Sequence, residues 1–287
     1  MTETLDRRLH AFRADLADIR LKGQVDAAVF IHGDPASLIV PVADLRPQPD
    51  WSAGIDTQLL LGENVRVFDR RDGFAWVQSD IDGYVGYLEE ASLGPVTTGP
   101  THRVIVPRTV LYPGADLRFP RAEVLSMGSR VTVAGEVETR GTCYAVLVDG
   151  RAAIAAHLMP LSALAEGDAV TWASLFLHTP YLWGGRSGFG MDCSGLVQMG
   201  LAMAGQDAPR DSDQQAASLG RELDPESEPL RRGDLVFWKG HVAFLEDEAT
   251  IVHASGGTMT VTCEPLAAAL ARIAPLHGAP ICYRRTL

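Results

Sequence analysis

The stretch that decides the fold of the C-terminal half reads Pro180-Tyr181-Leu182-Trp183-Gly184-Gly185-Arg186-Ser187-Gly188-Phe189-Gly190-Met191-Asp192-Cys193-Ser194-Gly195-Leu196-Val197. A glycine-rich loop runs directly into an apolar, periodic segment, so we expect Cys193 at the N-terminus of a helix. The helix dipole and the unpaired N–H groups at such a position favour a thiolate and can also receive an oxyanion. The stretch therefore predicts a cysteine nucleophile.

Two histidines further along the chain are candidates for the base that would serve this cysteine. His241 opens a predicted strand after Lys239-Gly240, and His253 lies at the end of the next strand. In an antiparallel pair the start of one strand lies beside the end of the next, so the two imidazoles can meet at one sheet edge. We expect His241 to act as the base and His253 to orient it.

Each of these residues also has an ordinary structural explanation. A lone cysteine at a helix start is often a small buried residue, and a lone histidine at a strand end is often a surface group. The order Cys, His, His behind a glycine-rich loop is much harder to obtain by chance. Zinc uses the same ligand types, but the long spacings contain no paired-ligand motif. The sequence therefore predicts neither a metal nor a cofactor.

The surrounding pattern indicates an α+β domain. Helices are expected over 169–177 and 194–204, and buried strands over 234–238, 242–245 and 250–252. Helices followed by an antiparallel sheet are typical of this class. Asp234 is interpreted as a residue that bonds a turn. The remaining cysteines and three large aromatic residues are expected to be packing groups: Cys143, Cys263, Cys282, Trp183, Phe237 and Trp238.

Residues 41–161 instead show short strand-like runs broken by Gly, Pro and Asp, the pattern of small all-β modules. The region repeats itself, because the segment from Leu60 to Val67 aligns with that from Leu125 to Val133 when one residue is allowed to slip. A Pro-, Gly- and Thr-containing linker over 94–101 separates the copies. We predict two barrels, at 41–95 and 101–161.

Residues 1–40 are predicted to form an N-terminal helical segment. Apolar residues recur there at alternating spacings of four and three with charged residues between them, the pattern of an amphipathic helix. The apolar residues of this stripe are Leu5, Leu9, Phe12, Leu16 and Ile19.

Composition narrows the function classes. The 287 residues are 46% hydrophobic and 21% charged, and the formal net charge is -11. An acidic chain argues against a nucleic-acid partner. The first residues are acidic without an apolar core, so we expect no secretory signal and a cytoplasmic location; no run is long enough to suggest a membrane partner. The pattern predicts no particular oligomeric state.

The C-terminal motifs resemble the NlpC-like papain-fold peptidases, which cut γ-D-glutamyl bonds in peptidoglycan peptides. The matching segments stand in the family's order, and the two barrels resemble bacterial SH3-type domains. The segments are Tyr181-x-Trp183-Gly184-Gly185, Asp192-Cys193-Ser194-Gly195, Pro209-Arg210-Asp211-Ser212, Arg232-Gly233-Asp234-Leu235-Val236-Phe237 and the two histidines. The resemblance implies an α+β chain with a papain-like cysteine peptidase domain at 165–287, preceded by two SH3-type barrels and an N-terminal helix.

The resemblance also implies a substrate, a murein peptide of the type L-Ala-γ-D-Glu-diamino acid, cleaved by an enzyme of cell-wall peptide recycling. Asp211 would face the free ammonium of L-Ala, although its place before a polar run also suits a helix N-cap. Tyr181, Asp192 and Ser194 would line the positions beside Cys193. Two residues of the first barrel, Glu63 and Tyr84, would close the pocket.

Two other readings remain open. Papain-like folds also carry out amidase, transglutaminase and acyltransferase reactions, because an acyl-cysteine can be passed to water or to an amine. The other alternative is a non-catalytic module that binds the cell wall through its SH3-type barrels. The complete set of one cysteine and two histidines argues against this non-catalytic module.

Overall fold

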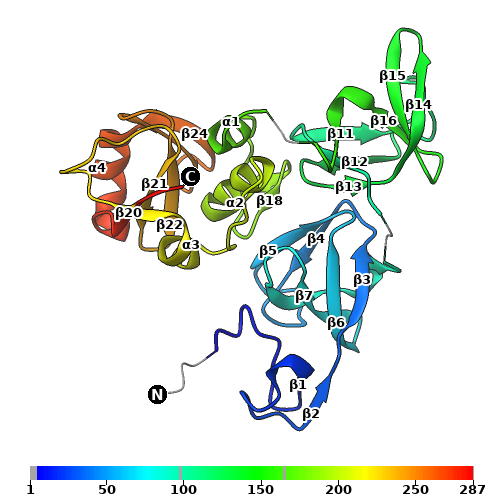
Figure 1. The fold of residues 1–287 in the computed structure, drawn as a ribbon, viewed down its shortest axis with the longest axis horizontal. Coiled ribbons are helices and arrows are strands. Elements are labelled where there is room, and N and C mark those ends of the chain that lie inside the picture. Colours follow the sequence, from blue (N-terminus) through cyan, green and yellow to red (C-terminus); the bar gives the residue numbers. More distant parts are fainter. Residues whose placement is uncertain (1–4, 97–98, 164–165, 287) are drawn as a thin grey trace. The chain divides into compact units, whose positions relative to one another are not determined.

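The computed structural model describes residues 5–96, 99–163 and 166–286, and the chain divides into two compact units after residue 163. Figure 1 shows the chain coloured from its N-terminus to its C-terminus. The predicted start of the catalytic domain, residue 165, lies outside the described residues. Each unit is described separately below.

The predicted N-terminal helix is wrong. Residues 5–15 form turns and bends, followed by β1 (Leu16–Asp18), the short 3-10 helix η1 (Ile19–Leu21) and β2 (Val29–Ile31), which pairs with β1 in parallel. Aspartate side chains accept hydrogen bonds from backbone N–H groups and hold this segment in turns instead of a helix. Asp6 accepts a hydrogen bond from the Arg8 N–H at 2.9 Å, and Asp18 accepts one from the Arg20 N–H at 2.8 Å.

Tertiary contacts with the first barrel also replace the helix. The Val85 N–H donates to the Arg8 carbonyl at 2.7 Å, so the segment is hydrogen-bonded to the barrel through its backbone. Ala11 packs in a cluster with Phe68 and Trp76. The Arg13 guanidinium lies 4.3 Å from the centre of the Trp76 ring. Of the predicted apolar stripe, Leu16 packs against this cluster, and all five residues of the stripe are half-buried.

The first barrel consists of a five-stranded sheet in the order β8-β7-β6-β3-β9 and the pair β4-β5. It begins before the predicted residue 41, because β3 pairs with β6 and β9. Its core is aliphatic, with Leu38, Leu45, Leu59, Val65, Val77 and Leu88 all buried. The elements are β3 (Asp34–Leu38), β4 (Val42–Leu45), β5 (Thr57–Leu60), β6 (Asn64–Arg71), β7 (Phe74–Ser79), β8 (Val85–Glu89), η2 (Glu90–Ser92) and β9 (Leu93–Gly94).

The second set of strands repeats the pairings of the first. Strand β10 pairs with β13 and β17 as β3 does with β6 and β9, β11 pairs with β12 as β4 does with β5, and β14-β15-β16 matches β6-β7-β8. The structure therefore confirms the internal repeat. The elements are β10 (His102–Val104), β11 (Arg108–Leu111), β12 (Glu123–Ser126), β13 (Arg130–Val131), β14 (Val133–Thr139), β15 (Thr142–Leu147), β16 (Ala152–Ile154), η3 (Ala155–His157) and β17 (Leu158–Pro160).

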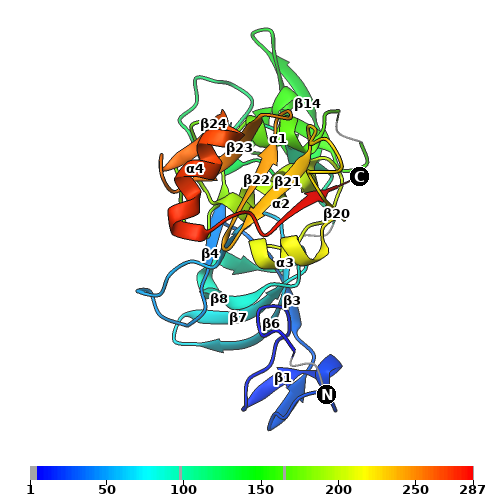
Figure 2. The same ribbon diagram turned by 90° about the vertical axis from the view of Figure 1, so that its left-hand side faces the viewer.

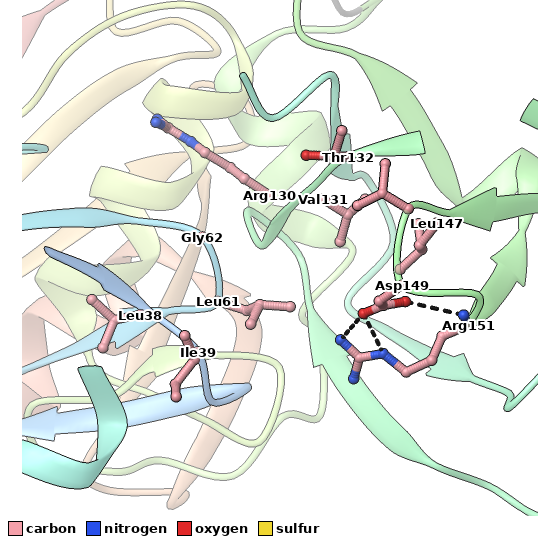
Figure 3. Close-up of a pocket in the computed structure, with 11 residues that line it drawn as sticks. Leu38, Ile39, Leu61, Gly62, Arg130, Val131, Thr132, Leu147, Asp149 and Arg151 are labelled. Atoms are coloured by element: carbon pink, nitrogen blue, oxygen red, sulfur yellow. Dashed lines mark hydrogen bonds and ion pairs between the residues drawn. The ribbon is translucent and has the colours of Figure 1, made fainter. Parts of the chain in front are cut away.

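Two glycines hold equivalent places in this repeat. Gly62 and Gly128 both have positive φ, and each donates its N–H to the strand that opens its own barrel, at Leu38 and Val104. A Cβ added at Gly62 would overlap the Arg130 carbonyl oxygen, so glycine lets the two copies approach. A pocket of about 250 Å³ lies at this approach, as Figure 3 shows, with the ion pair of Asp149 and Arg151 on its wall.

The C-terminal unit is a mixed helix and strand domain. Its six strands run in the order β20-β25-β21-β22-β23-β24, with every neighbour antiparallel. The predicted helices and buried strands are confirmed, with ends that differ by a few residues. The elements are α1 (Ala169–Ser174), β18 (Arg186–Ser187), β19 (Gly190–Met191), α2 (Cys193–Met203), α3 (Ser212–Ser218), β20 (Arg221–Leu223), β21 (Asp234–Trp238), β22 (His241–Leu245), β23 (Thr250–Ser255), β24 (Thr260–Pro265), α4 (Leu266–His277) and β25 (Cys282–Arg285).

Helices cover both faces of this sheet. Figure 1 shows the sheet between α4 and the pair α1 and α2, and Figure 2 shows β21, β22 and β23 side by side. Helix α2 packs on β22 and β23. On the other face, Ala269 and Ile273 of α4 join the apolar cluster that contains Val236, Ala243 and Ile251. Burial on both faces explains why the strands read as continuous apolar runs.

Several predicted packing residues are placed differently. Trp183 is 68% exposed, Cys143 and Cys263 are exposed, and Cys282 is half-buried, so these four are not core residues. Phe237 and Trp238 are buried as expected. Asp234 does bond a turn, accepting from the Arg231 N–H at 2.9 Å. Among the described residues, no helix has the length and apolar character needed to cross a membrane.

Candidate active site

Cys193 is the first residue of α2, as the sequence predicts, and is 6% exposed. Asp192 is the N-cap of this helix, and its Oδ1 accepts a hydrogen bond from the Gly195 N–H at 2.7 Å. A Cβ at position 195 would overlap the carbonyl oxygen of Gly185. Glycine at this position therefore allows the glycine-rich loop to lie against the first turn of the helix that holds the thiol.

Asp192 and Ser194, both predicted to line the substrate, have protein partners. Arg210 donates to Asp192 Oδ1 at 3.0 Å and to Oδ2 at 2.6 Å, and also to the Ser194 hydroxyl at 2.8 Å. The Gly184 N–H donates to Asp192 Oδ2 at 2.9 Å. These groups therefore fix the loop and the helix start. Their contact with substrate stays a prediction.

The two histidines meet as the strand arrangement predicts. His241 Nε2 lies 2.8 Å from His253 Nδ1. His253 is buried, with 1% of the residue exposed. The Trp238 ring packs at 5.5 Å from the His241 ring, centre to centre. His253 Nε2 lies 2.8 Å from Glu264 Oε1. Glu264 is a residue that the sequence analysis did not single out.

Burial controls the protonation of the thiol. Burial first and the nearby Asp192 carboxylate second raise the pKa of Cys193 to about 12, against the opposing effect of the Val242 and Ser194 N–H groups, which hydrogen-bond the sulfur. Burial therefore opposes the thiolate that the helix dipole favours. The bond to Val242 also places the sulfur beside the start of β22, where His241 stands.

Burial likewise keeps both imidazoles neutral. Burial first and the neighbouring His253 second lower the pKa of His241 to about 3, and burial together with the charge of Arg272 lowers the pKa of His253 to about 4. A neutral imidazole beside a neutral thiol can accept its proton as the sulfur attacks. The arrangement is therefore suited to nucleophilic catalysis in which His241 takes up the thiol proton.

Tyr181 lies beside Cys193, and Asp211 directly follows Arg210, whose guanidinium binds Asp192. The pKa of the Tyr181 phenol is raised, first by burial and then by the neighbouring Cys193 and Asp192. Asp211 is the N-cap residue of α3, as its sequence position suggests, although its side chain makes no capping hydrogen bond. Gln215, one turn later, donates to the Ser194 carbonyl at 3.0 Å and so ties α3 to the start of α2.

The two candidates from the first barrel belong to the other unit of the chain. Glu63 is buried, and its Oε2 accepts a hydrogen bond from the Leu60 N–H at 2.9 Å. Tyr84 is part of the apolar core of the first barrel. A role for either residue in closing the substrate pocket stays a prediction.

Arg210 and Glu264 are the site residues that sequence reasoning missed. Arg210 was part of a matched motif, yet it is 1% exposed, and such depth is unusual for an arginine without partners. Its signal in the sequence was its place next to Asp211. Glu264 had no local signal, because its contact with His253 arises only from the pairing of β23 with β24.

Known proteins resemble this chain in both units. Residues 178–272 match the NlpC/P60 family, and residues 45–93 match the bacterial dipeptidyl-peptidase Sh3 domain. A gamma-D-glutamyl-L-lysine dipeptidyl-peptidase of Bacillus cereus is 28% identical over 74% of this chain and 71% of its own length. A protein of the same name from Bacillus subtilis is 31% identical over 69% of this chain and 68% of its own length.

A solved structure shares the fold. The crystal structure of a NlpC/P60 family protein from Bacillus cereus superimposes with a TM-score of 0.72 and 23% identity, covering 88% of this chain and all of that one. With these matches, the thiol at a helix start and the histidine pair beside it define a cysteine peptidase. The chain belongs to the NlpC/P60 family.

Proposed function

We propose that this peptidase hydrolyses the bond between γ-D-Glu and the diamino acid in peptidoglycan-derived peptides that have a free N-terminal L-Ala. The observation that carries the chemistry is the 2.8 Å contact between His241 and His253 beside Cys193 at the start of α2. The substrate class is supported by two relatives that are named for γ-D-glutamyl-L-lysine. We further infer a papain-like C-terminal fold, in which the helix of the nucleophile packs on the sheet of the base.

The first half of the reaction forms an acyl-enzyme. His241 takes the proton of the Cys193 thiol while the sulfur attacks the γ-carbonyl carbon of D-Glu. The N–H groups in the first turn of α2 stabilise the resulting oxyanion. His241 then gives its proton to the leaving nitrogen as the peptide bond breaks. The diamino acid departs, and L-Ala-γ-D-Glu remains bound to Cys193 as a thioester.

The second half releases the dipeptide. His241, neutral again, takes a proton from water as the water oxygen attacks the thioester carbon. The proton passes to the departing sulfur, which restores the thiol and frees L-Ala-γ-D-Glu. Asp192 and Arg210 act throughout by holding the start of α2, because their charged groups are bonded to one another.

Recognition of the free ammonium is assigned to Asp211. A carboxylate beside an ammonium forms a charge-assisted hydrogen bond, whereas an acylated nitrogen offers it no charge. Tyr181 supplies a wall next to the thiol, and the same proposal gives Glu63 and Tyr84 the closing of the pocket. A requirement for the free amine suits peptides already cut from the wall, so the proposal includes murein recycling in the cytoplasm.

The function can be tested by incubating the intact enzyme with L-Ala-γ-D-Glu-diaminopimelate, or with the corresponding L-Lys peptide, and identifying the products by mass spectrometry. We expect L-Ala-γ-D-Glu and a free diamino acid, with the relative rates of the two peptides showing which diamino acid is preferred. Enzyme carrying Cys193→Ala is the matched control. Cleavage between L-Ala and D-Glu, or no cleavage of either peptide, would contradict the proposal. Cell fractionation tests the cytoplasmic location.

A further inference from the structure

The imidazole pair continues into a carboxylate and a guanidinium. His253 Nε2 lies 2.8 Å from Glu264 Oε1, and the same oxygen is paired with the guanidinium of Arg272. Strand register explains the first contact. Glu264 stands opposite Ile251, two residues before His253, so the two side chains point to the same face of the sheet.

The second contact follows from the chain connection. Helix α4 starts directly after β24, so Arg272 on that helix returns to the end of the strand that holds Glu264. The His253 side chain is fully buried, the Glu264 side chain is 19% exposed and that of Arg272 is 39% exposed. The three side chains thus form a row from the dry interior to the surface, and the Arg272 guanidinium at its outer end forms an ion pair with the Glu264 carboxylate.

This row fixes the proton positions on both rings. An ionised carboxylate can only accept, so the proton of neutral His253 lies on Nε2 and its Nδ1 is an acceptor. His241 Nε2 must then donate to that acceptor. The lone pair of neutral His241 is left on Nδ1. A base that takes the proton of a thiol needs a ring nitrogen in that state.

We propose that Glu264, held by Arg272, is a positioning residue that sets the tautomers of His253 and His241 so that Nδ1 of His241 accepts the proton of Cys193. The inference rests on the proposed function, because it takes His241 as the base. It gives the site a fourth and a fifth member that touch neither substrate nor sulfur. Carboxylates orient metal-bound and catalytic histidines in the same way in other proteins.

The charges of the pair act in opposite directions on the imidazoles. The carboxylate stabilises an imidazolium, and the guanidinium opposes it. Other groups facing the rings are His277 of α4, whose ring is 6.4 Å from that of His241, and the Cys193 thiol of α2 beside Val242. Trp238 of β21 contributes only an uncharged ring. Removal of Arg272 should therefore raise the pKa of both histidines, and removal of Glu264 should lower it further.

Nitrogen NMR of the intact chain with ¹⁵N-labelled histidine tests the tautomers directly. In the unmodified enzyme we expect protonated Nε2 and bare Nδ1 on both His241 and His253. Glu264→Gln should keep this pattern, because its amide oxygen can still accept from His253. Glu264→Ala should produce a mixture of tautomers. The same measurement in Cys193→Ala needs no turnover, so it reports on the row even if the proposed reaction is wrong.

Kinetics of the same variants test the consequence for catalysis. Glu264→Ala should lower kcat by about 10- to 100-fold with little change in KM, and Glu264→Gln should recover part of the loss. Arg272→Gln should raise the histidine pKa values measured by NMR while Glu264→Gln lowers them. Arg221→Gln, which breaks an exposed ion pair with Glu228 in the same unit, is the control and should change neither quantity.

Three results would overturn the proposal. Unchanged tautomers in Glu264→Ala would show that the carboxylate does not set them. Equal losses of kcat in the Ala and Gln variants with unchanged tautomers would show a merely structural role. Histidine pKa values that shift in the same direction in Glu264→Gln and Arg272→Gln would contradict the opposite electrostatic effects assigned to the carboxylate and the guanidinium. Turnover by Cys193→Ala would refute the proposed function alone, while the NMR result would still stand.

Discussion

Arg210 forms a two-pronged ion pair with Asp192, the residue directly before Cys193, and both side chains lie in the interior of the C-terminal unit. The pair connects the segment that leads into α3 with the N-cap of α2. Since the same guanidinium also donates to the Ser194 hydroxyl, one arginine holds the residues on both sides of the thiol. The position of the sulfur therefore depends on a charge contact formed across the fold.

Loss of this arginine should be costly. Arg210→Gln leaves the Asp192 carboxylate buried without its charged partner, and such a change destabilises a protein by about 3–5 kcal/mol. Chemical denaturation of the intact chain, followed by circular dichroism, should show a lower midpoint for the C-terminal unit. Arg221→Gln, in an exposed ion pair of the same unit, should leave that midpoint unchanged. Equal effects of the two changes would rule out a special role for the buried pair.

Replacement of the nucleophile should abolish turnover and preserve the fold. Cys193→Ala removes one sulfur atom from a buried helix start, so the unfolding midpoint should move little while peptide hydrolysis falls to the background rate. Cys193→Ser should be nearly as inactive, because a neutral imidazole activates a hydroxyl much less readily than a thiol. Hydrolysis assays check the loss of turnover, and circular dichroism on the same samples checks that the fold is preserved. Activity equal to that of the unmodified enzyme would exclude Cys193 as the nucleophile.

The two histidines should differ in importance. His241→Ala should reduce kcat/KM by about 10²- to 10⁴-fold, because it removes the group that moves the proton. His253→Gln can retain one hydrogen bond to His241 and should keep more activity than His253→Ala. Steady-state kinetics of the three variants provide the comparison. If the Gln and Ala variants at position 253 behave alike, His253 does not orient the base.

Peptides with a blocked amino terminus should be poor substrates. Acetylation of L-Ala removes the positive charge assigned to Asp211 and adds bulk where the pocket is expected to close, so kcat/KM should fall steeply relative to the free tripeptide. Asp211→Asn separates the effect of charge from that of bulk. It should lower kcat/KM for the free peptide and so narrow the difference in kcat/KM between the free and the acetylated peptide. Similar rates for free and acetylated peptide with the unmodified enzyme would exclude recognition of the amine.

Stability should fall on the acid side because both site histidines are buried and neutral. Their pKa values are lowered to about 3 for His241 and about 4 for His253, so between those values and about 6.5 the unfolded chain binds more protons than the folded one. The unfolding free energy should therefore decrease as pH falls through this window, by up to about 1.4 kcal/mol per pH unit for each histidine. Denaturation at several pH values should show that the unfolding free energy of His253→Gln depends less steeply on pH than that of the unmodified chain. An unchanged slope would mean that this ring is not responsible.

The amino-acid sequence by itself determined the features that depend on local order. It located the helix start at Cys193, the strands that carry His241 and His253, and the repeat of two β-modules, because apolar periodicity and glycine positions act over a few residues. Matching motifs also indicated the family. In the N-terminal segment the same periodicity misled, since contacts with the first barrel and aspartate side chains set that backbone.

Only the tertiary structure decided how the site is held and charged. The pairing of β23 with β24 brings Glu264 to His253, and the turn before α3 brings Arg210 to Asp192, contacts between residues that no local pattern connects. Protonation is likewise a property of the fold. Burial raises the pKa of Cys193 and lowers those of the histidines, because removal of water disfavours every charged form, and the depth of each group is set by the packing of α2 and α4 on the sheet.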